Sequence, residues 1–258
     1  MKPPKISIVI PSFNKANFIG QTLDSIIIQK YSNLEVIIQD GGSADGTLEI
    51  IKKYVRKYPE IFKLESKEDK GQLDAINKGL VKASGEILTF INADDVYEPN
   101  AFGFVAKAYK ENPDSLWFAG RGRVISSSGK EIAKAVTCYK NFLLALNSSF
   151  CLLTTNYLMQ PSVFITRKAW QKYGPFTGTT DFVMEYDFWL KLAAISMPVV
   201  VIRNVSEFRI EQTSKTKTIS GDLLSEDWRV VNKYTKNPFA LALHKLNNLG
   251  RVLVEKLV

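Results

Sequence analysis

Short apolar runs that alternate with amphipathic helix patterns are the feature that most constrains the fold. Residues 6–10 and 34–38 are rich in isoleucine and valine, and turn-forming or polar residues follow both runs. Between them, residues 18–27 carry apolar side chains at the 3.6-residue spacing of a helix. Because a strand, helix, strand order with short connections forms a right-handed unit, the pattern predicts two neighbouring parallel strands.

The same alternation continues along the chain, and polar residues follow each expected strand. It predicts two more helices and two more strands, at 46–58, 73–83, 62–64 and 86–91. Three strands therefore end at Pro11, at Asp40 and at residues 92–95. In open α/β sheets ligands bind beside the carboxyl ends of the strands, so these residues indicate a ligand site at one edge of the sheet.

The pattern after residue 98 is weaker, but it still predicts single elements. We expect helices and strands at 100–111, 116–119, 162–165, 167–173, 183–195 and 199–202, with a mixed segment up to about residue 160 and a polar loop at 211–220. The tail from residue 222 is typical of helices, and residues 239–257 place their leucines on one side. We therefore predict an α/β domain over residues 1–220 and a helical extension over 221–258.

The composition favours a folded domain and excludes several kinds of catalytic site. The 258 residues are 45% hydrophobic, and the formal charge of +8 favours anionic ligands such as nucleotide phosphates. Cys138, Cys151 and His244 are the only cysteines and the only histidine. They are too few for a disulfide framework, a zinc site or a Cys–His nucleophile. The chemistry is therefore expected to come from carboxylates.

The sequence also limits where the protein works and what it binds. No apolar run reaches the length of about 18 residues that a membrane-spanning helix needs, and residues 142–153 are interrupted by Asn147, Ser148 and Ser149. The start lacks the apolar core of a secretory signal, so we expect a cytoplasmic protein. No zinc-finger, RNP-like or basic-helix signature is present, and nucleic acid is not an expected partner.

Two adjacent acids, Asp94 and Asp95, end the apolar strand expected at 86–91. Adjacent carboxylates repel each other and are costly to bury without a partner. Exposed turn carboxylates are one interpretation. The other is that the acids, with Asn92, supply oxygen ligands for Mn²⁺ or Mg²⁺, which would relieve the repulsion and hold a diphosphate.

Two further stretches are consistent with a nucleotide site at the same edge. Asp40 stands at a strand end, where it either closes a turn or accepts hydrogen bonds from a ligand that lies against Gly41. Lys70 and Asp74 flank a helix start, which is either a solvated helix end or a phosphate contact.

Glu185 lies at the start of an amphipathic helix, beside several aromatic residues. The simplest interpretation of this helix is that it packs against the core. A carboxylate in partly apolar surroundings would also have a raised pKa, which suits a group that accepts a proton.

Taken together and in order, these stretches resemble the family-2 glycosyltransferases, which belong to the nucleotide-diphospho-sugar transferase superfamily. The resemblance covers about residues 5–215 and rests on residues 7–14, 40–47, 69–71, 74–79, 85–87, 92–95, 160–164 and 185–190. It implies the GT-A fold, a Rossmann-like, mostly parallel central sheet flanked by helices. It also implies inverting transfer of a sugar from a nucleotide-diphosphate sugar to an acceptor hydroxyl.

The resemblance further implies roles for individual residues. Glu185 matches the catalytic base, Asp94 and Asp95 the Mn²⁺ or Mg²⁺ ligands, and Gln160, Pro161 and Trp189 the acceptor side. The donor and nucleotide side would comprise Pro11, Ser12, Phe13, Asn14, Asp40, Gly41, Lys70, Asp74, Asn92, Ala93, Asp94 and Arg209. Relatives often carry a histidine where this chain has Glu211, which leaves Arg209 and Lys215 as the expected partners of the diphosphate.

The expected partners are a UDP-sugar or other nucleotide-diphosphate sugar and a glycan or lipid-linked acceptor. Such a reaction belongs to the synthesis of cell-surface polysaccharides or glycolipids. Residues 239–257 would either pack on the catalytic domain or contact the inner face of the cytoplasmic membrane. Two alternatives stay open: a sugar nucleotidyltransferase, which acts on a triphosphate, and a catalytically silent relative that binds nucleotide sugars.

Overall fold

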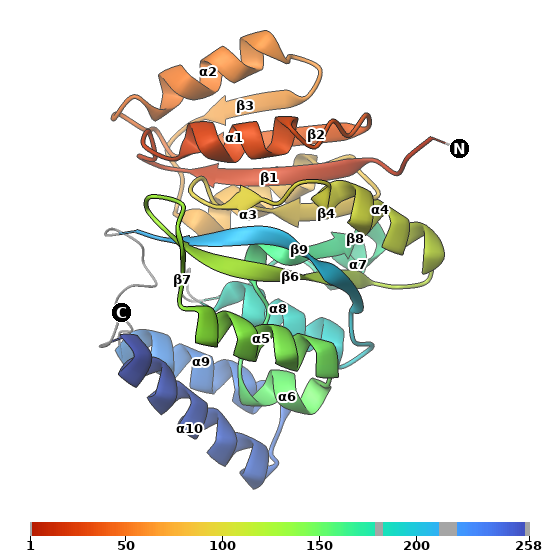
Figure 1. Ribbon diagram of the computed structural model, residues 1–258, viewed down its shortest axis with the longest axis vertical. Helices are drawn as coiled ribbons and strands as arrows, with labels where there is room; N and C mark the ends of the chain where they lie inside the picture. The colour runs from red at the N-terminus through yellow and green to blue at the C-terminus, as the bar shows by residue number, and fades with distance from the viewer. Residues whose placement is uncertain (1, 179–182, 212–220, 256–258) are drawn as a thin grey trace.

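The computed structural model describes residues 2–178, 183–211 and 221–255 and shows one mixed sheet with helices on both faces (Figure 1). The strands follow the order β3-β2-β1-β4-β8-β6-β9-β5, and β7 pairs with β6. They are β1 Ile6–Ser12, β2 Leu34–Asp40, β3 Phe62–Ser66, β4 Ile87–Phe90, β5 Val96–Tyr97, β6 Trp117–Ser126, β7 Glu131–Ile132, β8 Val163–Thr166 and β9 Val199–Ile210.

The helices surround this sheet and include every helix that the sequence predicts. They are α1 Ile19–Ile27, α2 Thr47–Lys57, α3 Gln72–Lys82, α4 Ala101–Glu111, α5 Lys134–Leu146, α6 Ser149–Thr154, α7 Arg167–Tyr173, α8 Met184–Ala193, α9 Gly221–Tyr234 and α10 Pro238–Glu255, with a short 3₁₀ turn η1 Gln160–Ser162. None of the helices in the described part of the chain is long and apolar enough to cross a membrane.

The first four strands of the sheet form the expected parallel unit. β1 pairs in parallel with both β2 and β4, and β2 pairs in parallel with β3. Alternate residues of β1 enter two different apolar clusters, Ile8 on the face of α1 and α4 and Val9 on the face of α3 and α8. Burial on both faces explains why the strand is apolar along its length rather than alternating with polar residues.

The second half of the sheet is less regular than the sequence predicts. β8 is antiparallel to β4 and β6, whereas β9 is parallel to β6. The strand expected at 199–202 extends to Ile210, and its register against β6 shifts around Arg121. Glycine permits the close approach here, because a Cβ on Gly120 would lie 2.2 Å from the Val205 side chain. The bulge interrupts the period-two pattern, so the sequence underestimates the length of β9.

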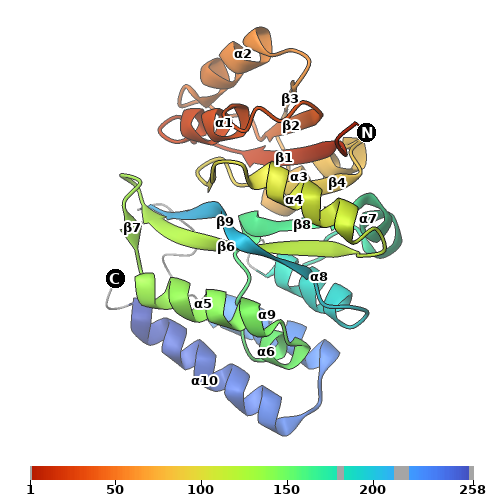
Figure 2. The ribbon, with the colours of Figure 1, turned by 45° about the vertical axis from the view of Figure 1, so that its right-hand side comes forward.

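The last two helices pack on the rest of the molecule. Figures 1 and 2 both place α10 beside α6 and α9, and α9 contacts α8. His244 of α10 is 1% exposed, and its ring stacks on Tyr186 of α8 with centroids 6.4 Å apart. For the inner side of α10, the structure therefore agrees with the interpretation that the tail packs on the rest of the molecule.

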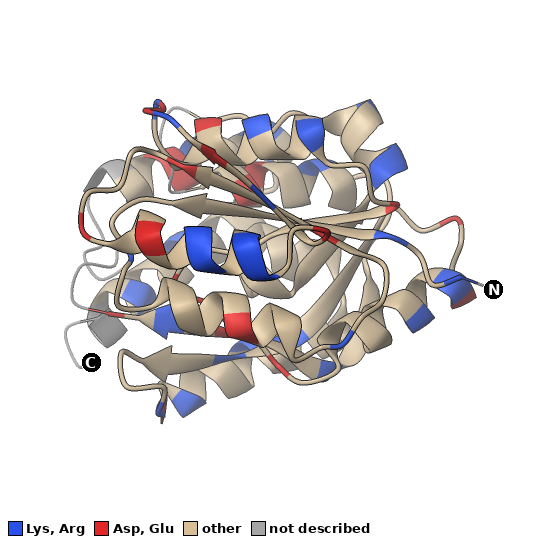
Figure 3. Cartoon of the chain, turned by 90° about the horizontal axis from the view of Figure 1, so that it is seen from above, with Lys and Arg blue, Asp and Glu red and all other residues tan. Residues whose placement is uncertain are grey.

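Charged residues of both signs share the end of the molecule that carries α2. In Figure 3, segments that carry Lys and Arg alternate with segments that carry Asp and Glu among the described residues.

Candidate active site

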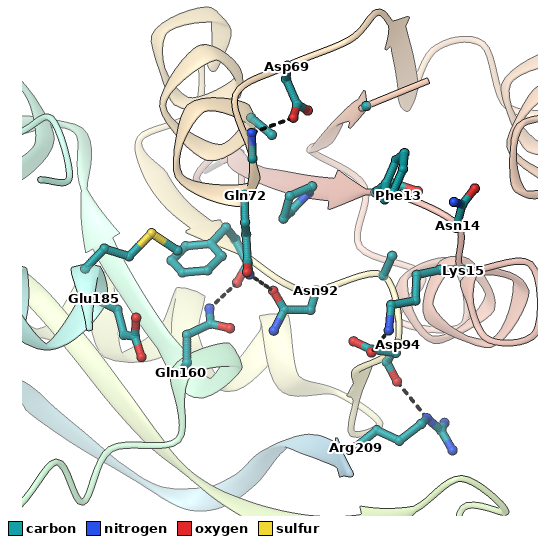
Figure 4. Close-up of a pocket in the computed structure, with 18 of the residues that line it drawn as sticks. Phe13, Asn14, Lys15, Asp69, Gln72, Asn92, Asp94, Gln160, Glu185 and Arg209 are labelled. Carbon is teal, nitrogen blue, oxygen red and sulfur yellow. Dashed lines mark hydrogen bonds and ion pairs between the residues drawn. The ribbon is translucent and has the colours of Figure 1, made fainter. Parts of the chain in front are cut away.

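A cavity of about 1080 Å³ lies at the carboxyl ends of β1, β2 and β4, the edge that the sequence predicts (Figure 4). α8 and β9 close its other side. The sequence-predicted residues that line it are Pro11, Ser12, Phe13, Asn14, Gly41, Asn92, Ala93, Asp94, Gln160, Glu185 and Arg209. The structure therefore brings the expected base and most of the expected donor-side residues to one cavity.

Asp40 is among the expected site residues that do not line this cavity. Its side chain is buried, and its two carboxylate oxygens accept hydrogen bonds from the backbone N–H groups of Gly42 and Ser43 and from the hydroxyls of Ser43 and Ser66. These contacts match the turn-closing interpretation, since the carboxylate is held by its own loop and by Ser66 at the end of β3.

The loop after β2 also fixes the loop after β1. The Asn14 N–H donates to Ser43 Oγ at 2.9 Å, and the Lys15 N–H donates to Thr47 Oγ1 at 2.7 Å. The Ala16 N–H donates to Asp45 Oδ2 at 3.0 Å. Residues 39–47 therefore act as a clamp that directs the Lys15 side chain, which the sequence did not single out, toward the cavity.

Four more expected residues lie outside the cavity lining. The Lys70 N–H donates to Asp74 Oδ2, and Asp74 pairs with Lys78 at 2.6 Å, which matches the interpretation of a solvated helix end. Trp189 is 2% exposed and stacks on Trp117 within the core. Pro161 is buried in η1. Only Gln160 of the three acceptor-side residues lines the cavity.

The two adjacent acids have different surroundings. Asp95 is fully buried, and its oxygens accept hydrogen bonds from the Arg209 N–H at 2.8 Å and from Asn92 Nδ2 at 3.1 Å. Burial, with the nearby charge of Asp94, raises the pKa of Asp95 well above its usual range despite these bonds. Asp94 instead lines the cavity. The expected pair of metal ligands is therefore not presented together.

Arg209 is committed to protein oxygens, although it borders the cavity. Its guanidinium donates to the backbone carbonyls of Asp94, Ser126 and Ser127 and to Gln21 Oε1. Figure 4 shows the side chain extending away from Glu185. These contacts hold the loop after β4 in place. Lys215, the other expected partner of a diphosphate, lies outside the described residues, with most of the polar loop at 211–220.

Lys15 is the cation that points toward Asp94 (Figure 4). Its Nζ donates to Asp94 Oδ2 at 2.7 Å and to Glu211 Oε1 at 2.8 Å. Burial alone would lower the pKa of Lys15, but the charges and hydrogen bonds of the two acids outweigh it and raise that pKa. The ammonium therefore stays protonated and bridges the ends of β4 and β9.

Glu185 stands on the opposite wall of the cavity, in the first turn of α8. Burial raises its pKa to about 7, opposed by the positive charges of Lys140 and Arg251 and assisted by the negative charge of Asp227. A carboxylate with a pKa near neutrality accepts a proton readily at physiological pH.

Two neutral side chains, Gln72 and Gln160, lie between Glu185 and Asp94 in Figure 4. Gln72 Nε2 donates to Asn92 Oδ1 at 2.6 Å, and Gln160 Nε2 donates to the Phe90 carbonyl at 2.8 Å. Asp69, near Gln72, also borders the cavity and accepts from the Gly71 N–H. Asp69 belongs to the stretch 69–71 that carries the family resemblance, but the sequence analysis gave neither Asp69 nor Gln72 a role in the site.

The carboxylates at this edge suit a divalent ion only if Glu211 takes the place of Asp95 beside Asp94. No group of three or more His, Cys, Asp or Glu residues in the described ranges is arranged to hold a metal. Asp94 and Glu211, however, direct one oxygen each at a single cation, the Lys15 ammonium. Two hard carboxylate oxygens fit Mn²⁺ or Mg²⁺ when water and phosphate oxygens complete the coordination.

A family profile described as glycosyl transferase family 2 matches residues 7–169. The chain is 27% identical over 248 residues to a hyaluronan synthase from Pasteurella multocida, covering 96% of this chain and 24% of that protein. An uncharacterized glycosyltransferase from Rickettsia felis is 27% identical over 218 residues, which are 82% of this chain and 35% of the relative. The chain thus spans about a third or less of these relatives.

Solved glycosyltransferases share the fold. The mannosyltransferase PcManGT from Pyrobaculum calidifontis, in complex with GDP-Man and Mn²⁺, superposes with a TM-score of 0.68 at 19% identity, covering 93% of this chain and 69% of that one. TarS from S. aureus, residues 1–349 in complex with UDP-GlcNAc, gives a TM-score of 0.70 at 19% identity, covering 90% and 67%. The predicted GT-A fold is confirmed.

Proposed function

The chain belongs to glycosyl transferase family 2, and from this premise we propose that it transfers a sugar from a nucleotide-diphosphate sugar to an acceptor hydroxyl. The observation that carries the proposal is the shared cavity, which Glu185 borders on one side and the strand-end residues Pro11 to Asn14 on the other. A base and a nucleotide-sized recess at the carboxyl ends of parallel strands are the parts that such a reaction needs.

In the proposed step, Glu185 accepts the proton of the acceptor hydroxyl. The hydroxyl oxygen then forms a bond to the anomeric carbon while the bond from that carbon to the diphosphate oxygen breaks. The electron pair of the broken bond leaves with the nucleotide diphosphate. Attack opposite to the leaving group inverts the anomeric configuration, and the fixed cavity walls hold the two reactants in line.

The donor we propose is a UDP-sugar, with a glycan or a lipid-linked molecule as acceptor. TarS was solved with UDP-GlcNAc, and a hyaluronan synthase and a chondroitin synthase from Pasteurella multocida are among the relatives. These relatives support a role in cell-surface polysaccharide or glycolipid synthesis. The nucleotide would lie between Phe13 and Gly41, because glycine lets a planar base approach the backbone.

The proposal includes Mn²⁺ or Mg²⁺ as a cofactor. Asp94 and Glu211 would hold the ion, rather than Asp94 and Asp95. Asp95 is excluded by its burial and its hydrogen bonds to Arg209 and Asn92. A bound divalent ion supplies positive charge against the departing diphosphate.

A donor screen tests the proposal directly. The full chain is incubated with UDP-, GDP-, CDP- and dTDP-sugars and simple glycan acceptors, with and without Mn²⁺, and released nucleotide diphosphate is measured. We expect release from one donor class by the natural chain and a large loss in Glu185→Gln. Pyrophosphate release from a triphosphate and a sugar phosphate would instead identify a nucleotidyltransferase. Binding of a nucleotide sugar without turnover would identify a silent relative.

The outer side of α10 supports a proposed cytoplasmic location at the inner face of the membrane. Phe239, Leu246 and Leu249 are exposed, Phe239 stacks on Phe150 of α6, and Phe142 of α5 is also exposed. The Tyr139 hydroxyl joins α5 to α10 through Asn247. An apolar surface with nearby cations is typical of interfacial helices.

Point variants test this contact better than truncation, which would remove His244 and uncover the Tyr186 ring on which it stacks. The double variant Leu246→Asp/Leu249→Asp should lose cosedimentation with vesicles that contain phosphatidylglycerol. Val81→Asp, at an exposed apolar position on α3, is the matched control. Equal pelleting of all three proteins would reject the membrane contact.

A further inference from the structure

The ion pairs of Lys15 are the feature that carries a further inference. Lys15 lies in the loop after β1, Asp94 in the loop after β4, and Glu211 directly after β9. Segments far apart in the sequence thus direct two carboxylates at one ammonium group, with N–O distances of 2.7 and 2.8 Å. These are the distances of strong charge-assisted hydrogen bonds.

The position of the ammonium is set by the fold rather than by chance contact of flexible side chains. Thr47 Oγ1 fixes the backbone of Lys15, and Asn14 adopts the left-handed conformation that turns the chain there. The side chains of Asp94 and Glu211 are 12% and 7% exposed, so water screens the pairs only weakly.

The two carboxylates would attract a divalent ion more strongly than a singly charged ammonium, because the Coulomb energy scales with the charge of the cation. A divalent ion requires the same two oxygens, at the slightly shorter distance of about 2.0–2.1 Å for Mg²⁺. An ammonium group and a metal ion do not fit between the same two oxygens at once.

We propose that Lys15 is the resident cation of the Asp94–Glu211 pair, and that a divalent ion binds there only by displacing the Lys15 ammonium. Lys15 thereby sets the metal affinity of the chain. Once displaced, its ammonium lies at the wall of the cavity, where it can donate to a phosphate oxygen.

Direct measurement of Mn²⁺ binding tests this proposal without a sugar donor, so its outcome is independent of the proposed transfer. Free Mn²⁺ is followed by electron paramagnetic resonance as it is titrated into the full chain. Lys15→Met should bind Mn²⁺ about ten- to a hundredfold more tightly than the natural chain, because the charge-assisted hydrogen bonds of the ammonium no longer compete with the ion. Glu211→Gln added to Lys15→Met should reverse the gain.

The controls separate this effect from a general loss of positive charge. Lys107→Met removes an exposed lysine that pairs with Glu111 on α4, and it should leave Mn²⁺ affinity unchanged. Lys15→Arg keeps the charge and should also bind weakly. If Lys15→Met does not fold, Lys15→Gln replaces it, and the rise of its Tm on Mn²⁺ addition provides a second measure of binding. Equal Mn²⁺ affinities of the natural chain and the Lys15 variant would overturn the proposal.

Discussion

The two walls of the cavity are built in different ways. On the wall at the ends of β1 and β2, the loops after these strands hold each other through hydrogen bonds, and Asp40 accepts hydrogen bonds from its own loop and from Ser66 of β3. On the opposite wall, Glu185 has a raised pKa, and charged groups from α5, α9 and α10 act on it. The difference teaches that Asp40 on the first wall maintains the shape of its loop, whereas Glu185 on the second wall is suited to accepting a proton.

The largest expected effect comes from replacing Glu185, the proposed base on the second wall. Glu185→Gln keeps the size of the side chain but loses the proton acceptor, so kcat should fall by about 10²–10⁴-fold. The affinity for the nucleotide diphosphate should not change, because the wall formed by Pro11 to Asn14 is intact. Steady-state kinetics and calorimetric titration with UDP check the two parts. Unchanged turnover would remove Glu185 from the mechanism.

The next largest effect is a loss of stability when Asp40, which holds the loop of the first wall, is replaced. Asp40→Ala leaves the N–H groups of Gly42 and Ser43 and the Ser66 hydroxyl without their buried acceptor, and should destabilise the fold by about 2–4 kcal/mol. Urea unfolding followed by circular dichroism measures the loss. Asp45→Ala, in the same loop, is a milder comparison, since Asp45 is less buried. A variant as stable as the natural chain would show that Asp40 does not hold the loop.

The pH dependence sharpens the comparison further. Glu185 is a base only when deprotonated, so kcat/KM should rise with pH through an apparent pKa near 7. Asp227→Asn removes a negative charge that raises this pKa, and should move the rise of kcat/KM to lower pH. Lys140→Met removes a positive charge that lowers it, and should move the rise to higher pH. Shifts in the same direction would contradict the electrostatic account.

The smallest expected effect concerns stability. A carboxyl group whose pKa is raised by folding binds its proton more tightly in the folded state, so its contribution to stability falls as pH rises from about 4.5 through 7. Glu185→Gln removes that loss. Its Tm relative to the natural chain should therefore be higher at pH 8 than at pH 5. Thermal unfolding at both values is the measurement, and an equal difference at the two would show that Glu185 has an ordinary pKa.

The sequence predicted the first half of the sheet and the location of the cavity, because strands buried on both faces leave long apolar runs that end in polar residues. It did not distinguish the roles of acids at those ends. Asp94 and Asp95 are neighbours with the same side chain, yet one lines the cavity and the other bonds to the Arg209 N–H of β9. That difference arises from a strand more than a hundred residues away.

Lys15 and the helices α5 and α6 were missed for related reasons. Lys15 gains its position from Thr47 and its partners from Asp94 and Glu211, none of which is near in sequence. α5 and α6 have weak amphipathic patterns, because only a few of their side chains, such as Leu143, Leu144 and Leu152, are buried. Tertiary contacts rather than local pattern decide both cases.

The helix α10 has a consequence for how the protein would be anchored. Its inner side contacts Tyr186, the neighbour of the proposed base Glu185, through the His244 ring, while its outer side carries Phe239, Leu246 and Leu249. The two sides are separated by a single helix diameter of about 10 Å. An attachment through the outer side would therefore be rigid. The cavity would stay at a fixed distance from the surface to which α10 binds.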